Sequence, residues 1–181
     1  MALNLEFIVR DIDTERLRLQ ALREHDAPFI LELLNEPSFI ANIGDKDVRD
    51  LVGAVNYISK GPQASYRQHG FGLMKVELRD GAIPVGICGL VRRDSLPHPD
   101  IGYAFLERHW GRGYASEAAA ACLDHAREWL DIAYVVGITA PHNHGSIRVL
   151  EKLGMTYDRM LELPGINGPS MYFVPAGAEE K

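Results

Sequence analysis

The change in hydrophobic period between residues 71 and 139 constrains the fold of this chain more than any other feature. Phe71–Leu78 and Ile83–Val91 flank a short polar turn and predict a β-hairpin, and Asp100–Leu106 predicts a third strand. The alanine-rich segment Glu117–Leu130 contains no Pro or Gly and predicts a helix. The continuous apolar run Ala133–Thr139 predicts the next strand. Strands on both sides of a helix indicate a mixed α/β domain.

The flanking segments extend this pattern in both directions. Before residue 71 we expect one strand and two helices: Glu15–Leu22, a helix from its N-cap Asp26 to about Leu34, and Val48–Ile58, which ends at Gly61 and Pro62. After residue 139 we expect a helix and two strands: Asn143–Leu153, closed by Gly154, then Met155–Leu163 and Ser170–Val174. The expected order is β-α-α-β-β-β-α-β-α-β-β, an α/β fold around one mixed sheet.

Composition excludes several classes of protein. The chain has 181 residues, 46% of them hydrophobic, which is enough to bury one core and argues against a disordered chain. Its net charge of −6 argues against a general nucleic-acid binder, because such a protein needs a basic surface to displace counterions. We expect one domain over residues 14–174, with an N-terminal extension at 1–13 and a tail at 175–181.

Two further features concern the compartment and the oligomeric state. Cys88 and Cys122 lie in apolar stretches and are expected to be buried free thiols, as in a reducing compartment. The N-terminus lacks the features of a signal peptide, and no apolar run is long enough to span a bilayer, so we expect a cytoplasmic protein with no membrane partner. The apolar patch at Leu5, Phe7, Ile8 and Val9 is a candidate interface for a homodimer.

The segment Arg108–Ala118 has the composition of an anion-binding loop. It joins a predicted strand to a predicted helix and contains Gly111 and Gly113. Glycine lets the backbone approach a ligand, and the first turn of a helix offers unpaired N–H groups to an anion, so the segment favours a phosphate site. The alternative is a tight strand-to-helix turn with no ligand. The segment matches neither the P-loop nor the complete dinucleotide-binding fingerprint.

Three motifs in this chain resemble those of the GNAT N-acetyltransferases. The run Arg108-x-x-Gly111-x-Gly113 is similar to the acyl-CoA loop of that family, and the wider string IGYAFLERHWGRGYASEA is similar to its branch of ribosomal-protein N-terminal acetyltransferases. The block from Asn143 to Met155 resembles the N-x-x-S-x-x-x-x-x-K-x-G-[FM] pattern of the same branch, and Thr14–Leu19 is a weaker third match. The resemblance covers residues 14–174.

The resemblance implies acetyl-CoA as the acetyl donor and no metal. In this family the strand before the loop splays from the next parallel strand, and the pantetheine arm lies in the gap. Here those strands are Asp100–Leu106 and Ala133–Thr139, with backbone contacts to the arm expected around Phe105 and Leu106. The residues expected to bind the pyrophosphate through backbone N–H groups are Gly111, Arg112, Gly113, Tyr114 and Ala115. The Arg112 side chain either adds a charge contact or is a solvated surface group.

Asn143 and Ser146 are expected on the other side of the gap. Asn143 suits an N-cap of the last helix, and the resemblance adds a contact to the pantetheine arm. Many relatives have a tyrosine acid in that helix, but the matching residue here is Leu150, which cannot donate a proton. The remaining donors are Ser146, a bound water and Tyr157. We place Ser146 first, because a serine there can hydrogen-bond the cofactor's sulfur as it leaves.

The general base has two candidates. Asp100, at the head of the splayed strand, comes first, and Glu77, on the hairpin, comes second; the alternative for each is a solvated carboxylate at a strand end. His142 and His144 invite assignment as metal ligands, but no Cys or acidic residue with ligand spacing lies nearby, so we expect a solvated loop there. Trp110 is expected to be a packing anchor beside the loop.

The resemblance therefore implies transfer of an acetyl group from acetyl-CoA to a primary amine, by direct attack in a ternary complex. The acceptor stays open between a protein N-terminus and a small-molecule amine, and its specificity should come from residues 29–70. The alternative is a non-catalytic acyl-CoA sensor or assembly module, because this fold can keep binding and lose chemistry.

Overall fold

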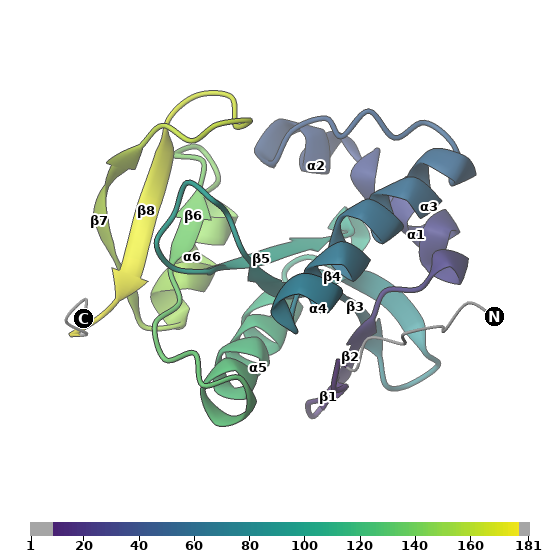
Figure 1. Ribbon diagram of the computed structural model, residues 1–181, viewed down its shortest axis with the longest axis horizontal. Coiled ribbons are helices and arrows are strands. Elements are labelled where there is room, and N and C mark those ends of the chain that lie inside the picture. Colours follow the sequence, from purple (N-terminus) through teal and green to yellow (C-terminus); the bar gives the residue numbers. More distant parts are fainter. Residues whose placement is uncertain (1–8, 178–181) are drawn as a thin grey trace.

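The computed structural model describes residues 9–177 (Figure 1). The strands are β1 (Ile12–Asp13), β2 (Leu17–Ala21), β3 (Leu73–Leu78), β4 (Ile83–Val91), β5 (Asp100–Phe105), β6 (Gly137–Thr139), β7 (Met155–Leu161) and β8 (Ser170–Pro175). The helices are α1 (Ala27–Leu34), α2 (Pro37–Asn42), α3 (Leu51–Lys60), α4 (Pro62–His69), α5 (Tyr114–Trp129) and α6 (His144–Lys152), with short 3₁₀ turns η1 (Glu24–Asp26) and η2 (Glu107–His109).

The strands form two hydrogen-bonded sheets rather than the one sheet that the sequence predicts. β1 to β5 lie in chain order in an antiparallel sheet, and β6-β8-β7 forms a second sheet beside it (Figure 1). Within the described residues a single parallel bridge, Asp100 with Val136, joins β5 to the segment leading into β6. Beyond this bridge the two strands part. The predicted strand at 133–139 shrinks accordingly to Gly137–Thr139, which pairs with β8 instead.

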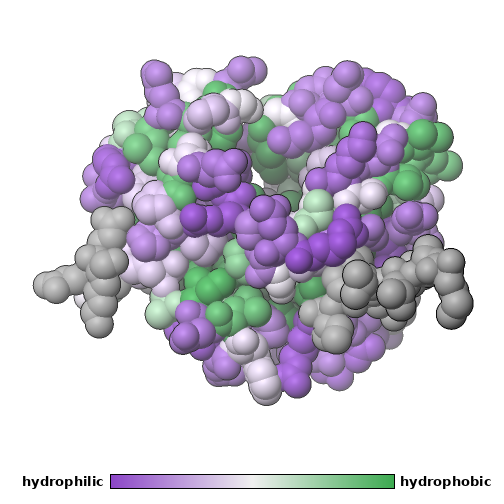
Figure 2. Space-filling view, in the orientation of Figure 1, coloured by the Kyte–Doolittle hydropathy of each residue, from purple (hydrophilic) through white to green (hydrophobic). Residues whose placement is uncertain are grey.

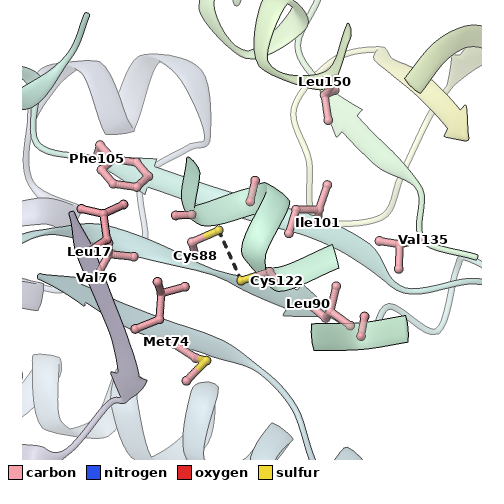
Figure 3. Packing of buried hydrophobic residues seen from close by; sticks show 14 of the residues in the cluster. Leu17, Met74, Val76, Cys88, Leu90, Ile101, Phe105, Cys122, Val135 and Leu150 are labelled. Carbon is pink, nitrogen blue, oxygen red and sulfur yellow. Dashed lines mark hydrogen bonds between the residues drawn. The ribbon is translucent and has the colours of Figure 1, made fainter. Parts of the chain in front are cut away.

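The main core lies between the five-stranded sheet and α5 (Figure 3). Leu17, Val76 and Cys88 from the sheet meet Ala118 and Cys122 from the helix, all buried. The small side chains along α5 let the helix approach the sheet closely. Cys88 and Cys122 are buried free thiols, as predicted, and their sulfurs lie 3.8 Å apart. This packing fixes the start of α5 relative to the end of β5.

A second core covers the opposite face of the sheet, under α1 and α3. The sequence predicted these two helices but missed α2 and α4, which both begin with proline, at Pro37 and Pro62. Gly61 and Pro62 mark the end of α3, as predicted, and Pro62 also takes the first position of α4, where no helical partner exists for the missing N–H. The phenol of Tyr66 fastens α4 to the sheet by accepting from Leu22 N, at 3.1 Å, and donating to Leu73 O.

One prediction lies mostly outside the residues that the structure describes. The apolar patch proposed for a homodimer lies mostly within residues 1–8, outside the described residues. Between residues 9 and 177, no helix combines the length and apolarity needed to cross a bilayer.

Candidate active site

The loop between β5 and α5 has the backbone shape that two glycines permit. Gly111 has φ +73° and Gly113 has φ +80°, a region that other residues enter only with strain. Helix α5 begins at Tyr114, three residues before the predicted start, and its first helical hydrogen bond is Glu117 N to Gly113 O, at 3.1 Å. The N–H groups of the first turn therefore precede the helical ladder, and together with the positive end of the helix dipole they can bind an anion.

An ion pair between Arg16, the residue before β2, and Glu117 of α5 holds this loop. The Arg16 guanidinium contacts Glu117 Oε2 through Nη2 at 2.6 Å and Nε at 2.7 Å, and the Arg16 backbone N donates to Glu117 Oε1 at 3.0 Å. Thr14 Oγ1 donates to the same Oε1 at 2.7 Å. Arg16 Nη1 also donates to Arg112 O, at 3.0 Å, inside the glycine loop. We call Thr14, Arg16 and Glu117 the loop brace.

The loop brace changes the titration of Glu117. Partial burial acts to raise the pKa of this carboxyl, but hydrogen bonds from Thr14 and Arg16 and the charge of Arg16 outweigh it, so the pKa lies below its usual value. Glu117 is therefore ionised at neutral pH and remains a partner for Arg16. The sequence contained Thr14–Leu19 as a weak motif, but nothing local connected it with a residue 101 positions away.

The edge of β5 offers backbone groups to the gap. Leu106 N donates to Val85 O at 2.9 Å, so by the alternation of an antiparallel ladder the odd-numbered residues of β5 turn their N–H groups to the other side. Ile101 N uses that side to reach Val136 O, at 2.9 Å. Tyr103 and Phe105 turn the same way beyond the point where the strands part. Pantetheine contains amides, which can pair with such groups as an added strand would.

Three of the backbone groups of Phe105 and Leu106 already have partners within the protein. Both backbone groups of Leu106 have partners, Val85 O and the N–H of His109. Trp110 Nε1 donates to Phe105 O at 2.8 Å, which ties the loop to the end of β5 although the indole is half exposed. The N–H groups of Tyr103 and Phe105 are the ones that the ladder leaves pointing into the gap.

The facing wall comes from the start of α6. Asn143 is its N-cap, as predicted, with Oδ1 accepting from Ser146 N at 3.1 Å. Ser146 Oγ lies 2.8 Å from the phenol oxygen of Tyr103, a residue that sequence reasoning missed. Leu150, where many relatives have tyrosine, is fully buried, and close packing of α6 on β6 leaves no room for a Cβ at Gly137. Tyr157 is half exposed on β7.

The two candidate bases do not contact Ser146 or the glycine loop. Asp100 is 2% exposed and accepts from Arg93 Nε at 2.9 Å. Burial raises the pKa of Asp100, and the charge and hydrogen bond of Arg93 oppose this. Glu77 lies in β3, with β4 between it and β5, and is 3.4 Å from Lys75 Nζ, which also bonds Asp26 at 3.0 Å.

The His109 side chain, in the turn η2 before the two glycines, lacks a hydrogen-bond partner among the described residues. Both of its ring nitrogens are buried and make no hydrogen bond within residues 9–177. Burial and the neighbouring Arg108 and Arg112 lower the pKa of this imidazole, so it is neutral at neutral pH. The glycine loop and its helix N-terminus fit an acyl-CoA phosphate.

No metal site accompanies these residues in the part of the chain that the structure describes, where no group of three or more His, Cys, Asp or Glu is placed to hold an ion. His142 Nε2 lies 3.2 Å from Ala41 O, so the loop before α6 touches the end of α2 rather than being wholly solvated. Figure 2 shows a hollow between the two halves of this face, with hydrophobic residues inside it.

Residues 16–156 match the profile of the acetyltransferase (GNAT) domain. This chain belongs to the GNAT family of acetyltransferases. It is 34% identical over 152 residues to the uncharacterized protein YkkB of Bacillus subtilis (strain 168), a match covering 82% of this chain and 86% of YkkB. The chain therefore has the GNAT fold and, as a member of this family, uses an acyl-CoA.

Solved structures agree with this assignment. The acetyltransferase from Agrobacterium tumefaciens str. C58 has a TM-score of 0.78 at 28% identity, covering 96% of this GNAT chain and 98% of its own. RimL, a ribosomal alpha-N-protein acetyltransferase solved in complex with coenzyme A, has a TM-score of 0.78 at 17% identity, covering 91% of this chain and 97% of its own. At that identity RimL shows the shared fold alone.

A valine at position 113 tests the glycine loop. We expect Gly113→Val to abolish the thermal shift that acetyl-CoA gives the wild type, because the side chain enters the anion cradle and the positive φ is lost. The fold should lose only about 1–3 kcal/mol, the cost of one strained residue. Gly165→Val is the matched control, since Gly165 has φ +77° and open space around it, in the β7–β8 loop. A Gly113→Val protein stabilised as much as the wild type would exclude this loop.

Removing the charge of Glu117 tests the loop brace. Glu117→Gln should weaken acetyl-CoA binding roughly 3- to 10-fold, measured by calorimetry, because one charge-assisted contact to the loop is lost. The pKa of Glu117 is lowered in the folded protein. The contribution of its ion pair to the stability of the folded loop is therefore present above the unfolded pKa and is lost as pH falls through the lowered pKa. The affinity of the wild type for acetyl-CoA should therefore weaken at acid pH, and the affinity of Glu117→Gln should not change in this way. Asp124→Asn, which removes an exposed ion pair on the same helix, is the control. Equal affinity for Glu117→Gln and wild type contradicts the brace.

Proposed function

We propose that this protein transfers the acetyl group of acetyl-CoA to a primary amine by direct attack in a ternary complex. The observation that carries the proposal is the parting of β5 and β6 after one bridge, with an anion-binding loop at the end of β5 and Ser146 on the facing wall. Family membership supports acyl transfer, and the site supports the finer assignment.

The residues divide the binding between two ends. Backbone N–H groups of Gly111, Arg112, Gly113, Tyr114 and Ala115 bind the pyrophosphate, as the resemblance implied, with the charges of Arg16 and Arg112 beside them. The N–H groups of Tyr103 and Phe105 bind the amides of the pantetheine arm. Asn143 uses its Oδ1 on Ser146 N, which leaves its side-chain NH₂ as a donor to the arm.

Acetyl-CoA supplies the acetyl group as a thioester, and coenzyme A departs as the thiol. The acceptor nitrogen forms the new C–N bond while the C–S bond breaks and its electron pair stays on sulfur. The proton that the nitrogen loses balances the one that the sulfur gains, and an acceptor that begins as an ammonium releases a further proton. Ser146 Oγ–H donates to the sulfur as charge develops there, which is where a hydrogen bond accelerates the step.

Of the two candidate bases we keep Asp100, acting through water. It lies in β5 itself, at the closed end of the gap, whereas Glu77 lies two strands away in β3. The raised pKa of Asp100 brings the carboxylate closer to the range in which a base is effective at neutral pH.

The alternative function is a non-catalytic acyl-CoA sensor. The observation favouring it is the buried Leu150, which removes the tyrosine acid that many relatives use. Thiol release from acetyl-CoA should be measured with a panel of amines, including ribosomal-protein N-terminal peptides, spermidine and aminoglycosides. Turnover above the no-amine rate with any acceptor supports the transferase. Tight acetyl-CoA binding with no turnover across the panel supports the sensor.

Ser146→Ala should lower kcat about 10- to 100-fold, the scale of one hydrogen bond to developing charge, and should move the KM for acetyl-CoA much less. Single-turnover rates should be measured as well, because slow product release would mask an effect on the chemical step. Normal single-turnover chemistry in Ser146→Ala would remove Ser146 from the mechanism and leave Tyr157 or water as the donor.

A further inference from the structure

Tyr103 makes a contact across the gap that no motif indicated. It projects from β5, where the strand has already parted from β6, and its phenol oxygen reaches the first turn of α6. The phenol oxygen lies 2.8 Å from Ser146 Oγ and 3.2 Å from Ser146 O. The first distance is typical of a hydroxyl–hydroxyl hydrogen bond, and the second is longer than the usual range for an O–H donor. The dominant partner of Tyr103 is therefore the hydroxyl of Ser146.

Only two arrangements of the two hydroxyl protons satisfy this contact. In one, Ser146 donates to the phenol oxygen of Tyr103 and the phenol donates to Ser146 O, so the serine proton points away from any ligand in the gap. In the other, Tyr103 donates to Ser146 Oγ, and the serine proton is free to point into the gap. A phenol is the stronger donor of the two hydroxyls, and each bond in a donor chain strengthens the next.

We propose that Tyr103 is the positioning residue for Ser146: its phenol donates to Ser146 Oγ and so directs the serine proton to the sulfur that leaves. This inference rests on the proposed transferase function. The C–N bond forms, the C–S bond breaks with its electron pair on sulfur, and Tyr103 keeps its own proton throughout. Burial raises the pKa of Tyr103, which agrees with a phenol that holds a hydrogen bond rather than one that ionises.

A purely structural Tyr103 would behave differently. Its contact with α6 joins the two halves of the split sheet, so losing it could cost stability with no effect on chemistry. Tyr66 provides the matched comparison, because its phenol also bridges separate elements, Leu22 N and Leu73 O, but in the second core. A phenylalanine at either position removes one buried hydroxyl and keeps the ring.

The test is a double-mutant cycle between Tyr103 and Ser146. We expect Tyr103→Phe to lower the single-turnover rate about 10-fold with the KM for acetyl-CoA nearly unchanged, and Tyr103→Phe with Ser146→Ala to be no slower than Ser146→Ala alone. Tyr66→Phe should lower the melting temperature without lowering the rate. Melting temperatures of all variants, with and without acetyl-CoA, establish that each is folded and binds.

Three results would overturn the inference: a wild-type rate in Tyr103→Phe, rate losses that multiply in the double variant, or a rate loss in Tyr66→Phe equal to that in Tyr103→Phe. The failure of the proposed function reads differently. The absence of turnover on every amine rejects the proposed function, and normal single-turnover chemistry in Ser146→Ala rejects the role of Ser146. Either result also overturns the role of Tyr103. A slow Ser146→Ala beside a normal Tyr103→Phe rejects the role of Tyr103 alone.

Discussion

One backbone pairing governs this structure: the single parallel bridge between Asp100 and Val136. It joins the two sheets at one point and lets β5 and β6 diverge beyond it. Divergence leaves the N–H groups of Tyr103 and Phe105 without a strand to pair with, although buried backbone groups are almost always paired in proteins. A ligand with amides of its own can take the place of the absent strand. In the proposed function, the gap binds the pantetheine arm because the sheet is split there.

The other parts of the site depend on where this split lies. The end of β5 leads directly into the glycine loop, so the N-terminus of α5 meets the mouth of the gap. The core between α5 and the sheet fixes the helix, and the loop brace fixes the loop itself through Arg16. On the far wall, Asn143 caps α6 and places Ser146 opposite Tyr103. The Arg93–Asp100 ion pair lies at the closed end, in the strand that carries the bridge.

The sequence predicted the features that depend on short-range patterns, and it did not predict those that depend on contacts between distant residues. The period of Phe71–Leu78 and Ile83–Val91 and the glycine spacing at Gly111 and Gly113 predicted the hairpin and the loop. Gly61 and Pro62 mark the end of α3, as predicted, but we did not consider that a proline can also begin a helix, as Pro37 and Pro62 do in α2 and α4. The expected single sheet was wrong, since periodicity shows that a strand exists but not whether its edge is paired.

The contacts on which the proposed function depends join residues that lie far apart in the sequence, and no local pattern predicted them. Thr14 and Arg16 lie about a hundred residues from Glu117, and only the fold brings them together. In the sequence, Tyr103 fits the pattern of an apolar strand and has no other distinguishing feature. Its contact with Ser146 forms only in the folded protein, where β5 faces α6. Asp100 and Glu77 were chosen as carboxylates near the site, but a sequence cannot show that each already has a cationic partner.

Residue-level amide hydrogen exchange with and without acetyl-CoA tests the central claim most directly. Gly102 and Ala104 pair with β4, so their amides should exchange slowly in both states. Those of Tyr103 and Phe105 should exchange quickly in the free protein and slow sharply with acetyl-CoA, together with the amides of residues 111–115. This alternating pattern along one strand is what a ligand bound in the gap predicts. Unchanged exchange at Tyr103 and Phe105 under saturating acetyl-CoA, with protection elsewhere, would contradict the account.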